Sequence, residues 1–185
     1  MKKTWIIIGV IAVVIIIGSF GYYNRLITGA ETVDKQWAQV ETQYQRRFDL
    51  IPNLVESVKG IMTQEQEVFG KLADARAHYS GAGTVNEKAA AATEVEGALS
   101  RLLVVMENYP QLKSADTVNT LMAQLEGTEN RVSVERGRFN DEVRSYNVTV
   151  KRFPGNVFAR LFGFDQRNYF EATAGSETAP AVNLK

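Results

Sequence analysis

The side chains most capable of chemistry in this sequence are one histidine and the carboxylate that precedes it. Asp74 lies four residues before His78, which places both on one helical face at the spacing of two metal ligands. Two ligands are too few for a metal site, and a solvated histidine beside a turn is the simpler interpretation. The chain has no cysteine, which excludes thiolate ligands, disulfides and a thiol nucleophile. We therefore expect no catalytic residue, no cofactor and no metal.

Paired carboxylates recur along the chain, and such pairs hold di-iron centres in some helical bundles. That chemistry also needs a glutamate followed three residues later by histidine on two helices, and this chain has a single histidine. No glycine-rich phosphate loop follows a strand, and no serine lies in a nucleophile turn. The formal net charge is zero, so no broad basic surface for nucleic acid is expected. The paired carboxylates of this chain are Glu65 and Glu67, Glu94 and Glu96, and Glu126 and Glu129. The composition favours a protein that is not an enzyme.

Two groups of residues are candidates for binding a partner. The first surrounds a proline inside a helical pattern and comprises Arg46, Arg47, Asp49, Pro52 and Asn53. Pro52 removes a backbone donor, so we expect a kink whose freed carbonyl groups need donors nearby. A binding groove at this kink is the alternative interpretation.

The second candidate group is the aromatic segment Phe158, Leu161, Phe162 and Phe164 near the end of the chain. The spacing predicts a short helix capped by Asn156, with most of these side chains on one face. Such a face could pack on the bundle, cover an interface between chains or touch lipid.

Helices must position both groups, and the pattern predicts an all-α fold. Apolar residues in alternating steps of three and four predict one long helix from Thr32 to the turn at 80–84, with a coiled-coil-like seam and a kink at Pro52. The alternative is two helices, the second capped by Asp49. Two further helices are predicted, at 86–109 and from Ser114 or Asp116 to about 153.

Short connections make consecutive helices antiparallel, which predicts an up-and-down bundle whose first and third helices run parallel. Four charged residues, Arg47, Glu65, Glu129 and Arg136, occupy seam positions of these helices. They could form ion pairs between helices, but we favour long side chains that reach the edge of the bundle. The first and third helices exceed the second in length, so they would extend as a two-helix stalk or pair with another chain. We therefore expect a homo-oligomer.

The run from Trp5 to Tyr23 contains no charge and predicts a transmembrane helix. As a helix it would be about 28 Å long, close to the thickness of the hydrocarbon core. A cleavable signal peptide is the alternative. Lys2 and Lys3 in the basic cap at 1–4 outnumber Arg25 directly after the span, so the positive-inside rule places the following domain outside the cytoplasm, in the periplasm.

Several phrases of the sequence, taken together and in order, resemble the LemA family of bacterial proteins. They are Tyr23-Asn24-Arg25-Leu26, the run 46–55, Val58-Lys59-Gly60, the run 107–113, 128–131, Phe139-Asn140, Tyr146-Asn147, Phe153-Pro154 and Phe162-Gly163-Phe164. The resemblance implies an N-terminal membrane anchor followed by a helical bundle domain, here placed at 24–171. It implies no reaction, because the family has no established enzymatic activity.

Together these patterns predict a single-pass protein of the bacterial inner membrane that self-associates and acts as a scaffold or adaptor. Its expected partners are the lipid bilayer, further copies of itself and a membrane protein, but not nucleic acid. The alternative is a chaperone-like binding module for a membrane protease or an envelope-stress partner. Residues 172–185 are small and polar, which predicts a disordered tail.

Overall fold

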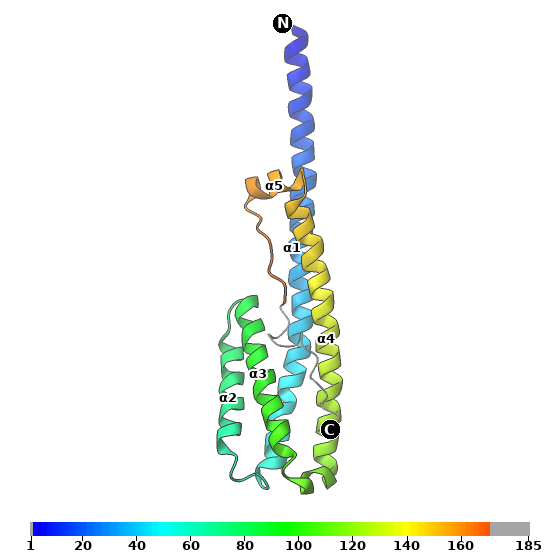
Figure 1. Cartoon of the computed structure of the whole chain (residues 1–185). Coiled ribbons are helices and arrows are strands. Elements are labelled where there is room, and N and C mark those ends of the chain that lie inside the picture. Colours follow the sequence, from blue (N-terminus) through cyan, green and yellow to red (C-terminus); the bar gives the residue numbers. More distant parts are fainter. Residues whose placement is uncertain (1, 171–185) are drawn as a thin grey trace, which may run out of the picture. The chain divides into compact units, whose positions relative to one another are not determined.

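The structure is a computed structural model that describes residues 2–170, without the side chains of residues 2–4, 8, 10–12, 14–16 and 113. The predicted tail at 172–185 and Met1 of the basic cap lie outside the described residues. The described chain is all-α, as predicted, with helices in the order shown in Figure 1. They are α1 (Lys2–Lys59), α2 (Gln66–Gly81), α3 (Val85–Met106), the 3₁₀ helix η1 (Pro110–Ser114), α4 (Asp116–Lys151) and α5 (Gly155–Phe162).

The chain divides into two compact units. Unit 1 combines Met1–Gln39 with Glu135–Tyr169, and unit 2 combines Val40–Val134 with Phe170–Lys185. Helices α1 and α4 contribute residues to both units, whereas α2 and α3 belong to unit 2 and α5 belongs to unit 1. The predicted domain boundaries at residues 24 and 171 stay predictions.

Unit 2 is a bundle of four helical segments, in which α2 and α3 form a hairpin (Figure 1). Its core combines aliphatic side chains at helical spacing with a cluster of rings from α1 and α2. The ring of Phe48 meets that of Tyr79 edge to face at 4.8 Å, and Tyr44 stacks on Phe48 at 5.4 Å. Fully buried aliphatic residues include Leu54, Val58, Leu72, Val95, Leu99 and Leu102.

The prediction of one helix from Thr32 to residue 80 is wrong, because the chain turns between α1 and α2. The amides of Ile61 and Met62 both donate to the carbonyl of Val58, at 3.0 and 2.9 Å, and close the end of α1. Gly60 follows the last residue of α1, and glycine is among the weakest helix formers. The alternative break capped by Asp49 is also wrong, since Asp49 lies inside α1. Pro52 lies inside the same helix, and the predicted kink there stays a prediction.

This additional turn reverses the direction of the last long helix, so α1 and α4 are antiparallel and not parallel. In unit 2, Arg47 of α1 contacts Leu125 and Glu129 of α4. In unit 1, the ring of Trp37 lies 5.5 Å from that of Phe139. Gly29 of α1 also lies beside Tyr146 of α4 in unit 1, so residue numbers on the two helices run in opposite directions there. The up-and-down arrangement is kept, with four helical segments in place of three.

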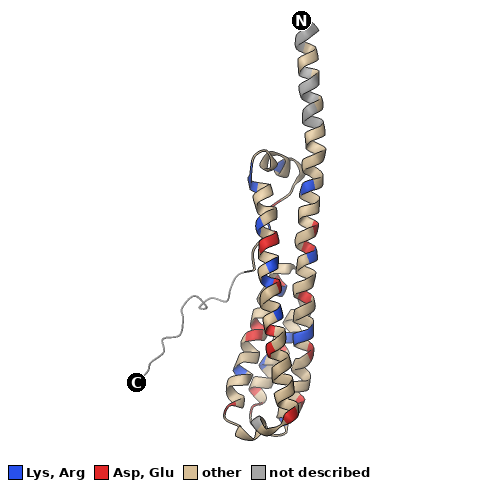
Figure 2. Cartoon of the chain, turned by 90° about the vertical axis from the view of Figure 1, so that its right-hand side faces the viewer, with Lys and Arg blue, Asp and Glu red and all other residues tan. Residues whose placement is uncertain are grey.

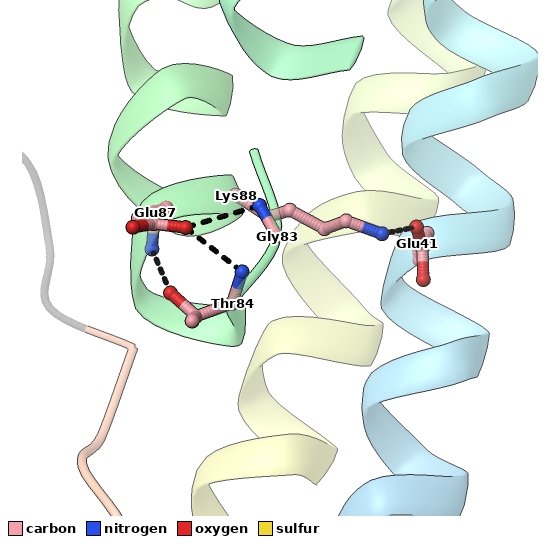
Figure 3. A network of polar contacts seen from close by, with 5 residues as sticks. All are labelled: Glu41, Gly83, Thr84, Glu87 and Lys88. Atoms are coloured by element: carbon pink, nitrogen blue, oxygen red, sulfur yellow. Dashed lines mark hydrogen bonds and ion pairs between the residues drawn. The ribbon is translucent and has the colours of Figure 1, made fainter. Parts of the chain in front are cut away.

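Helix α3 begins with a capping box, shown in Figure 3. The Thr84 hydroxyl accepts a hydrogen bond from the Glu87 amide at 3.2 Å, and the Glu87 carboxylate accepts from the Thr84 and Gly83 amides at 2.9 and 3.0 Å. These bonds satisfy donors that the first turn of a helix leaves without partners. They also lower the pKa of the Glu87 carboxyl. Lys88 then forms an ion pair with Glu41 of α1, which ties this end of α3 to the bundle.

Unit 1 is built on a close pair of helices. Gly29 of α1 lies against the Tyr146 ring of α4, so near that a Cβ added at Gly29 would be 3.0 Å from the ring. Apolar side chains of both helices are buried along this contact: Leu26, Val33 and Trp37 of α1, and Phe139, Val143 and Tyr146 of α4. Within unit 1, α1 and α4 thus cover each other's apolar residues in a single chain.

Among the residues that the structure describes, no helix is long and apolar enough to cross a membrane. The predicted transmembrane segment at 5–23 is therefore not confirmed.

Candidate functional site

Two residues of the second candidate group, Leu161 and Phe162, line a cleft of unit 1 that we call the aromatic groove. It is an open, apolar cleft of about 440 Å³ between α1 and α5. Leu161 and Phe162 line it from α5, and Ser19, Phe20 and Tyr23 line it from α1. Both sides come from helices, but these helices belong to opposite ends of the sequence, so local geometry alone does not form the groove.

Close packing at Gly155 fixes the start of α5. A Cβ added at this buried glycine would lie 2.2 Å from the carbonyl oxygen of Thr149, so only glycine fits without movement of the backbone. The prediction that Asn156 caps α5 is wrong, because Pro154 holds the cap position and Asn156 lies within the helix. The Asn156 amide donates instead to the carbonyl of Arg152 at 3.0 Å, which continues the hydrogen bonding from α4 across the turn.

Two features hold the chain beyond α5. Gly163 adopts a left-handed conformation with φ of 73°, and the Phe164 amide donates to the Ala159 carbonyl at 2.8 Å. Further along, the side-chain amide of buried Asn147 makes two hydrogen bonds to the backbone of Arg167. Its Nδ2 donates to the Arg167 carbonyl at 2.8 Å, and its Oδ1 accepts from the Arg167 amide at 2.9 Å. These two hydrogen bonds hold the extended segment after α5 against α4.

Aromatic contacts bring three of the four predicted residues of this group together. Phe158 stacks on Tyr22 with ring centroids 5.0 Å apart, and Phe162 meets Tyr23 edge to face at 5.0 Å. Phe164 also meets Tyr23 edge to face, at 6.1 Å. Leu161 behaves differently, since its side chain is 70% exposed at the rim of the aromatic groove. The segment therefore packs on α1 with its phenylalanines and presents Leu161 outward.

The first candidate group does not form one site. Arg46, Asp49 and Asn53 are exposed on α1, whereas Arg47 on the same helix is buried in the core of unit 2. Helical spacing explains this split, because neighbouring residues lie about 100° apart around the axis. Pro52 is half-buried between the two faces.

The preferred interpretation of Arg47, a side chain reaching the bundle edge, is wrong, and the alternative ion pair is correct. Its Nη1 lies 2.7 Å from a carboxylate oxygen of Glu129 and donates to the Leu125 carbonyl at 3.0 Å. The Glu129 side chain is partly exposed, so water shares in its solvation. Of the other charged seam residues, Glu65 accepts a hydrogen bond from the Tyr109 hydroxyl at 3.1 Å, which raises the pKa of Tyr109.

A second open cleft, of about 330 Å³, lies between α2 and α3, and Asp74 and His78 are among the residues that line it. The Nδ1 atom of His78 is 3.1 Å from a carboxylate oxygen of Glu94, a partner that the sequence analysis did not assign to it. Glu94 comes from the neighbouring helix α3, which the turn at 82–84 brings back alongside α2. Among the described side chains, no three histidines, cysteines or carboxylates gather to hold a metal ion.

The α1 half of the aromatic groove is not predicted from the sequence, where Phe20, Tyr22 and Tyr23 belong to the uncharged run at 5–23. The available signal was the match in aromatic density between 20–23 and 158–164, two segments that the antiparallel pairing of α1 and α4 brings together.

Residues 36–184 of the chain match the sequence model of the LemA family. Among curated proteins, the chain is similar to magnetosome protein MamQ of Magnetospirillum gryphiswaldense, with 26% identity over 182 positions that cover 84% of this chain and 67% of the relative. Magnetosome proteins MamQ 1 and MamQ 2 of Paramagnetospirillum magneticum match with the same identity and coverage.

Proposed function

Because the chain belongs to the LemA family, we propose that it is a non-enzymatic, single-pass protein of the bacterial inner membrane. Its helical units serve as a scaffold or adaptor at the membrane surface, on the periplasmic side. The relatives are named as magnetosome proteins, and these names state no reaction.

The observation that carries this proposal is the row of exposed apolar side chains on the first turns of α1. Trp5, Ile6, Ile17 and Phe20 are each about two-thirds exposed, and no charge occurs between residues 5 and 23. Exposure of so many large apolar side chains to water would be costly, whereas in hydrocarbon it is favourable. Tyr22 and Tyr23 at the end of the run suit the interface between lipid and water.

Membrane extraction tests the anchor. We expect the full chain to stay in the membrane fraction after washing at high pH and high salt, which release peripheral proteins, and to require detergent. A chain that begins at Asn24 serves as the control and should appear in the soluble fraction. Release of the full chain by the alkaline wash would contradict the proposal.

Self-association is a separate part of the proposal. The uneven helix lengths no longer demand it, since α1 and α4 cover each other in unit 1. Crosslinking in detergent followed by size analysis tests it directly. A single-chain particle at every protein concentration would remove self-association and leave a scaffold that acts as one chain.

The alternative, a chaperone-like binding module, is supported by the exposed polar face of α1 around Arg46, Asp49 and Asn53. Its test must leave Arg47 intact, because a change there would damage the core. Arg46→Glu should abolish binding of a membrane-protein partner while the fold is unchanged, with the exposed Arg101→Glu on α3 as the matched control.

A further inference from the structure

Helix α5 presents an apolar face that no described side chain of unit 1 covers. The face consists of Val157 and Leu161, which lie four residues apart on the helix, and Phe153 is exposed in the turn just before it. The side chains of Val157, Leu161 and Phe153 are 53%, 70% and 79% exposed. On the opposite face, Ala159 is buried and Phe158 stacks on Tyr22. The helix is therefore apolar on both faces, yet only one of them is packed.

The direction of α5 matters for what can cover this face. Figure 1 shows that α5 runs across the axis of α1 and not along it. Its contacts with Tyr22 and Tyr23 place it at the end of the uncharged run 5–23. A helix that lies across a transmembrane helix at this level lies in the plane of the bilayer surface.

The charged residues on α5 and directly before it are all basic, and the nearest acidic residue in the sequence, Asp165, follows three residues after the helix ends. Lys151, Arg152 and Arg160 are exposed, and no acidic residue occurs between 151 and 164. Figure 2 shows basic residues at the end of α4 and on α5. An apolar face flanked by basic residues is the pattern of helices that lie in the headgroup region of anionic membranes.

A second copy of the chain is a weaker candidate for the occupant. A helix of eight residues is only about 12 Å long, and one such face is much smaller than a stable protein interface of about 1,200–2,000 Å². A bilayer covers the face without this requirement, because it continues from the lipid around the anchor.

We propose that α5 is an interfacial helix that lies on an anionic bilayer surface. Phe153, Val157 and Leu161 enter the boundary of the acyl chains, while Arg152 and Arg160 contact lipid phosphates. The aromatic groove beside Leu161 then opens toward lipid and receives part of an acyl chain. This inference rests on the proposed membrane anchor, and the experiment separates the two.

The absence of cysteine allows single reporters to be introduced into the full chain. Leu161→Cys carries an environment-sensitive fluorophore on α5, Ile17→Cys carries it on the anchor, and Val104→Cys carries it on the exposed surface of α3. Each labelled protein is reconstituted into phosphatidylcholine vesicles with added phosphatidylglycerol, and spin-labelled phospholipid is used as a short-range quencher. Circular dichroism and thermal unfolding verify that each variant is folded.

We expect the quencher to reduce the fluorescence at Leu161→Cys and Ile17→Cys severalfold more than at Val104→Cys. Quenching at Ile17→Cys without quenching at Leu161→Cys would overturn the inference about α5 and leave the anchor intact. No quenching at either position would overturn both. A third outcome is that the fluorophore at Leu161→Cys is shielded from water to an extent that depends on the ratio of protein to lipid, while the lipid quencher has no effect on it. This outcome would assign the face to a second copy and overturn the inference.

The charge contribution has its own variant. Arg152→Gln combined with Arg160→Gln should reduce quenching at Leu161→Cys in vesicles that contain phosphatidylglycerol, with little change in pure phosphatidylcholine. Arg101→Gln, on α3, is the matched control and should change neither. Equal quenching of the double variant and the parent in both vesicle types would overturn the role of the basic residues.

Discussion

Arg46 and Arg47 are adjacent, identical in chemistry and opposite in environment. Arg46 is exposed, whereas Arg47 is buried and joins α1 to α4 through Glu129 and the Leu125 carbonyl. An ion pair of this kind adds little net stability relative to an apolar core, but the loss of one partner disturbs packing and leaves polar groups unsatisfied. The position of the pair within the bundle therefore specifies how α1 and α4 align in unit 2.

We predict that Arg47→Ala lowers the free energy of unfolding by about 2–3 kcal/mol, because it removes buried packing, a hydrogen bond and an ion pair. Arg46→Ala should change it by less than about 0.5 kcal/mol, as is usual for an exposed position. Urea unfolding in detergent, followed by circular dichroism, measures both. Equal effects of the two substitutions would contradict the buried ion pair.

Tyr79 should make the stability of the bundle depend on alkaline pH. Burial, with a smaller contribution from the Glu41 carboxylate, raises the pKa of its hydroxyl from 10.0 to about 12. Since the folded state holds this proton more tightly than the unfolded state does, its stabilising effect is complete below pH 10 and is lost as pH rises toward 12. We expect a loss of roughly 1–2 kcal/mol over this range.

Tyr79→Phe is the matched control for this pH dependence. In the described structure the hydroxyl oxygen of Tyr79 is buried and has no hydrogen-bond partner. Its removal should therefore change the free energy of unfolding little at neutral pH. Urea unfolding at a series of pH values should show a shallower decline for Tyr79→Phe than for the parent. Parallel declines would assign the alkaline loss to other groups.

At the level of elements, the sequence predicts the helical fold but not the turn that separates α1 from α2. The apolar series runs through Leu54, Ile61 and Val68 without a change of period, so it suggested one helix across the turn at 60–65. In the structure Ile61 is partly exposed in that turn, whereas Met62 beside it is buried. Periodicity reports which residues become buried, and a short turn that preserves the period leaves little trace in it. Gly60 was the available signal.

The turn between α4 and α5 should be intolerant of side chains. We predict that Gly155→Ala lowers the free energy of unfolding by about 1–3 kcal/mol, because a Cβ would overlap the Thr149 carbonyl and force the backbone to move. Gly137→Ala, in the middle of α4 where no heavy atom lies within 4 Å of the new Cβ, should instead be stabilising by about 0.5–1 kcal/mol. Thermal unfolding in detergent compares the two, and the same sign for both would contradict the packing at Gly155.

The capping box of α3 gives a second test at this scale. Thr84→Ala removes the acceptor of the Glu87 amide and should cost about 1 kcal/mol, with faster hydrogen exchange in the first turn of α3. Thr84→Ser keeps the hydroxyl and should behave like the parent. If the amide hydrogen of Glu87 exchanges at the same rate in Thr84→Ala as in the parent, the cap does not stabilise the first turn of α3.

For the whole molecule, the sequence indicated the class of fold but not the aromatic groove. Each half of the groove was visible as a cluster of aromatic residues, at 20–23 and at 158–164. Their meeting depends on the direction of α4 relative to α1, which the missed turn at 60–65 reverses. The pairing of Asn147 with the backbone of Arg167 was equally hidden, because an asparagine inside a helix is usually solvated.

The proposed orientation in the membrane concerns the whole chain, and it depends on few charges. With Val104→Cys as a reporter, we expect a membrane-impermeant maleimide to label the bundle from outside intact spheroplasts. Lys2→Gln combined with Lys3→Gln removes the bias and should lower the labelled fraction. Arg25→Gln should leave the labelled fraction the same or raise it. Labelling of the parent protein only after the spheroplasts are lysed would contradict the periplasmic placement.

The nesting of the two units in the sequence sets the order in which a ribosome can complete them. Unit 2 is almost wholly encoded as one continuous stretch, Val40–Val134, whereas unit 1 takes its residues from both sides of that stretch. Synthesis proceeds at about 5–20 residues per second, so the apolar face of α1 in unit 1 must wait several seconds for the α4 residues that cover it. Throughout that interval, while the residues of unit 2 are being added, the segment around Leu26 and Val33 lacks the α4 side chains that cover it, and a chaperone that protects this segment would act in this period.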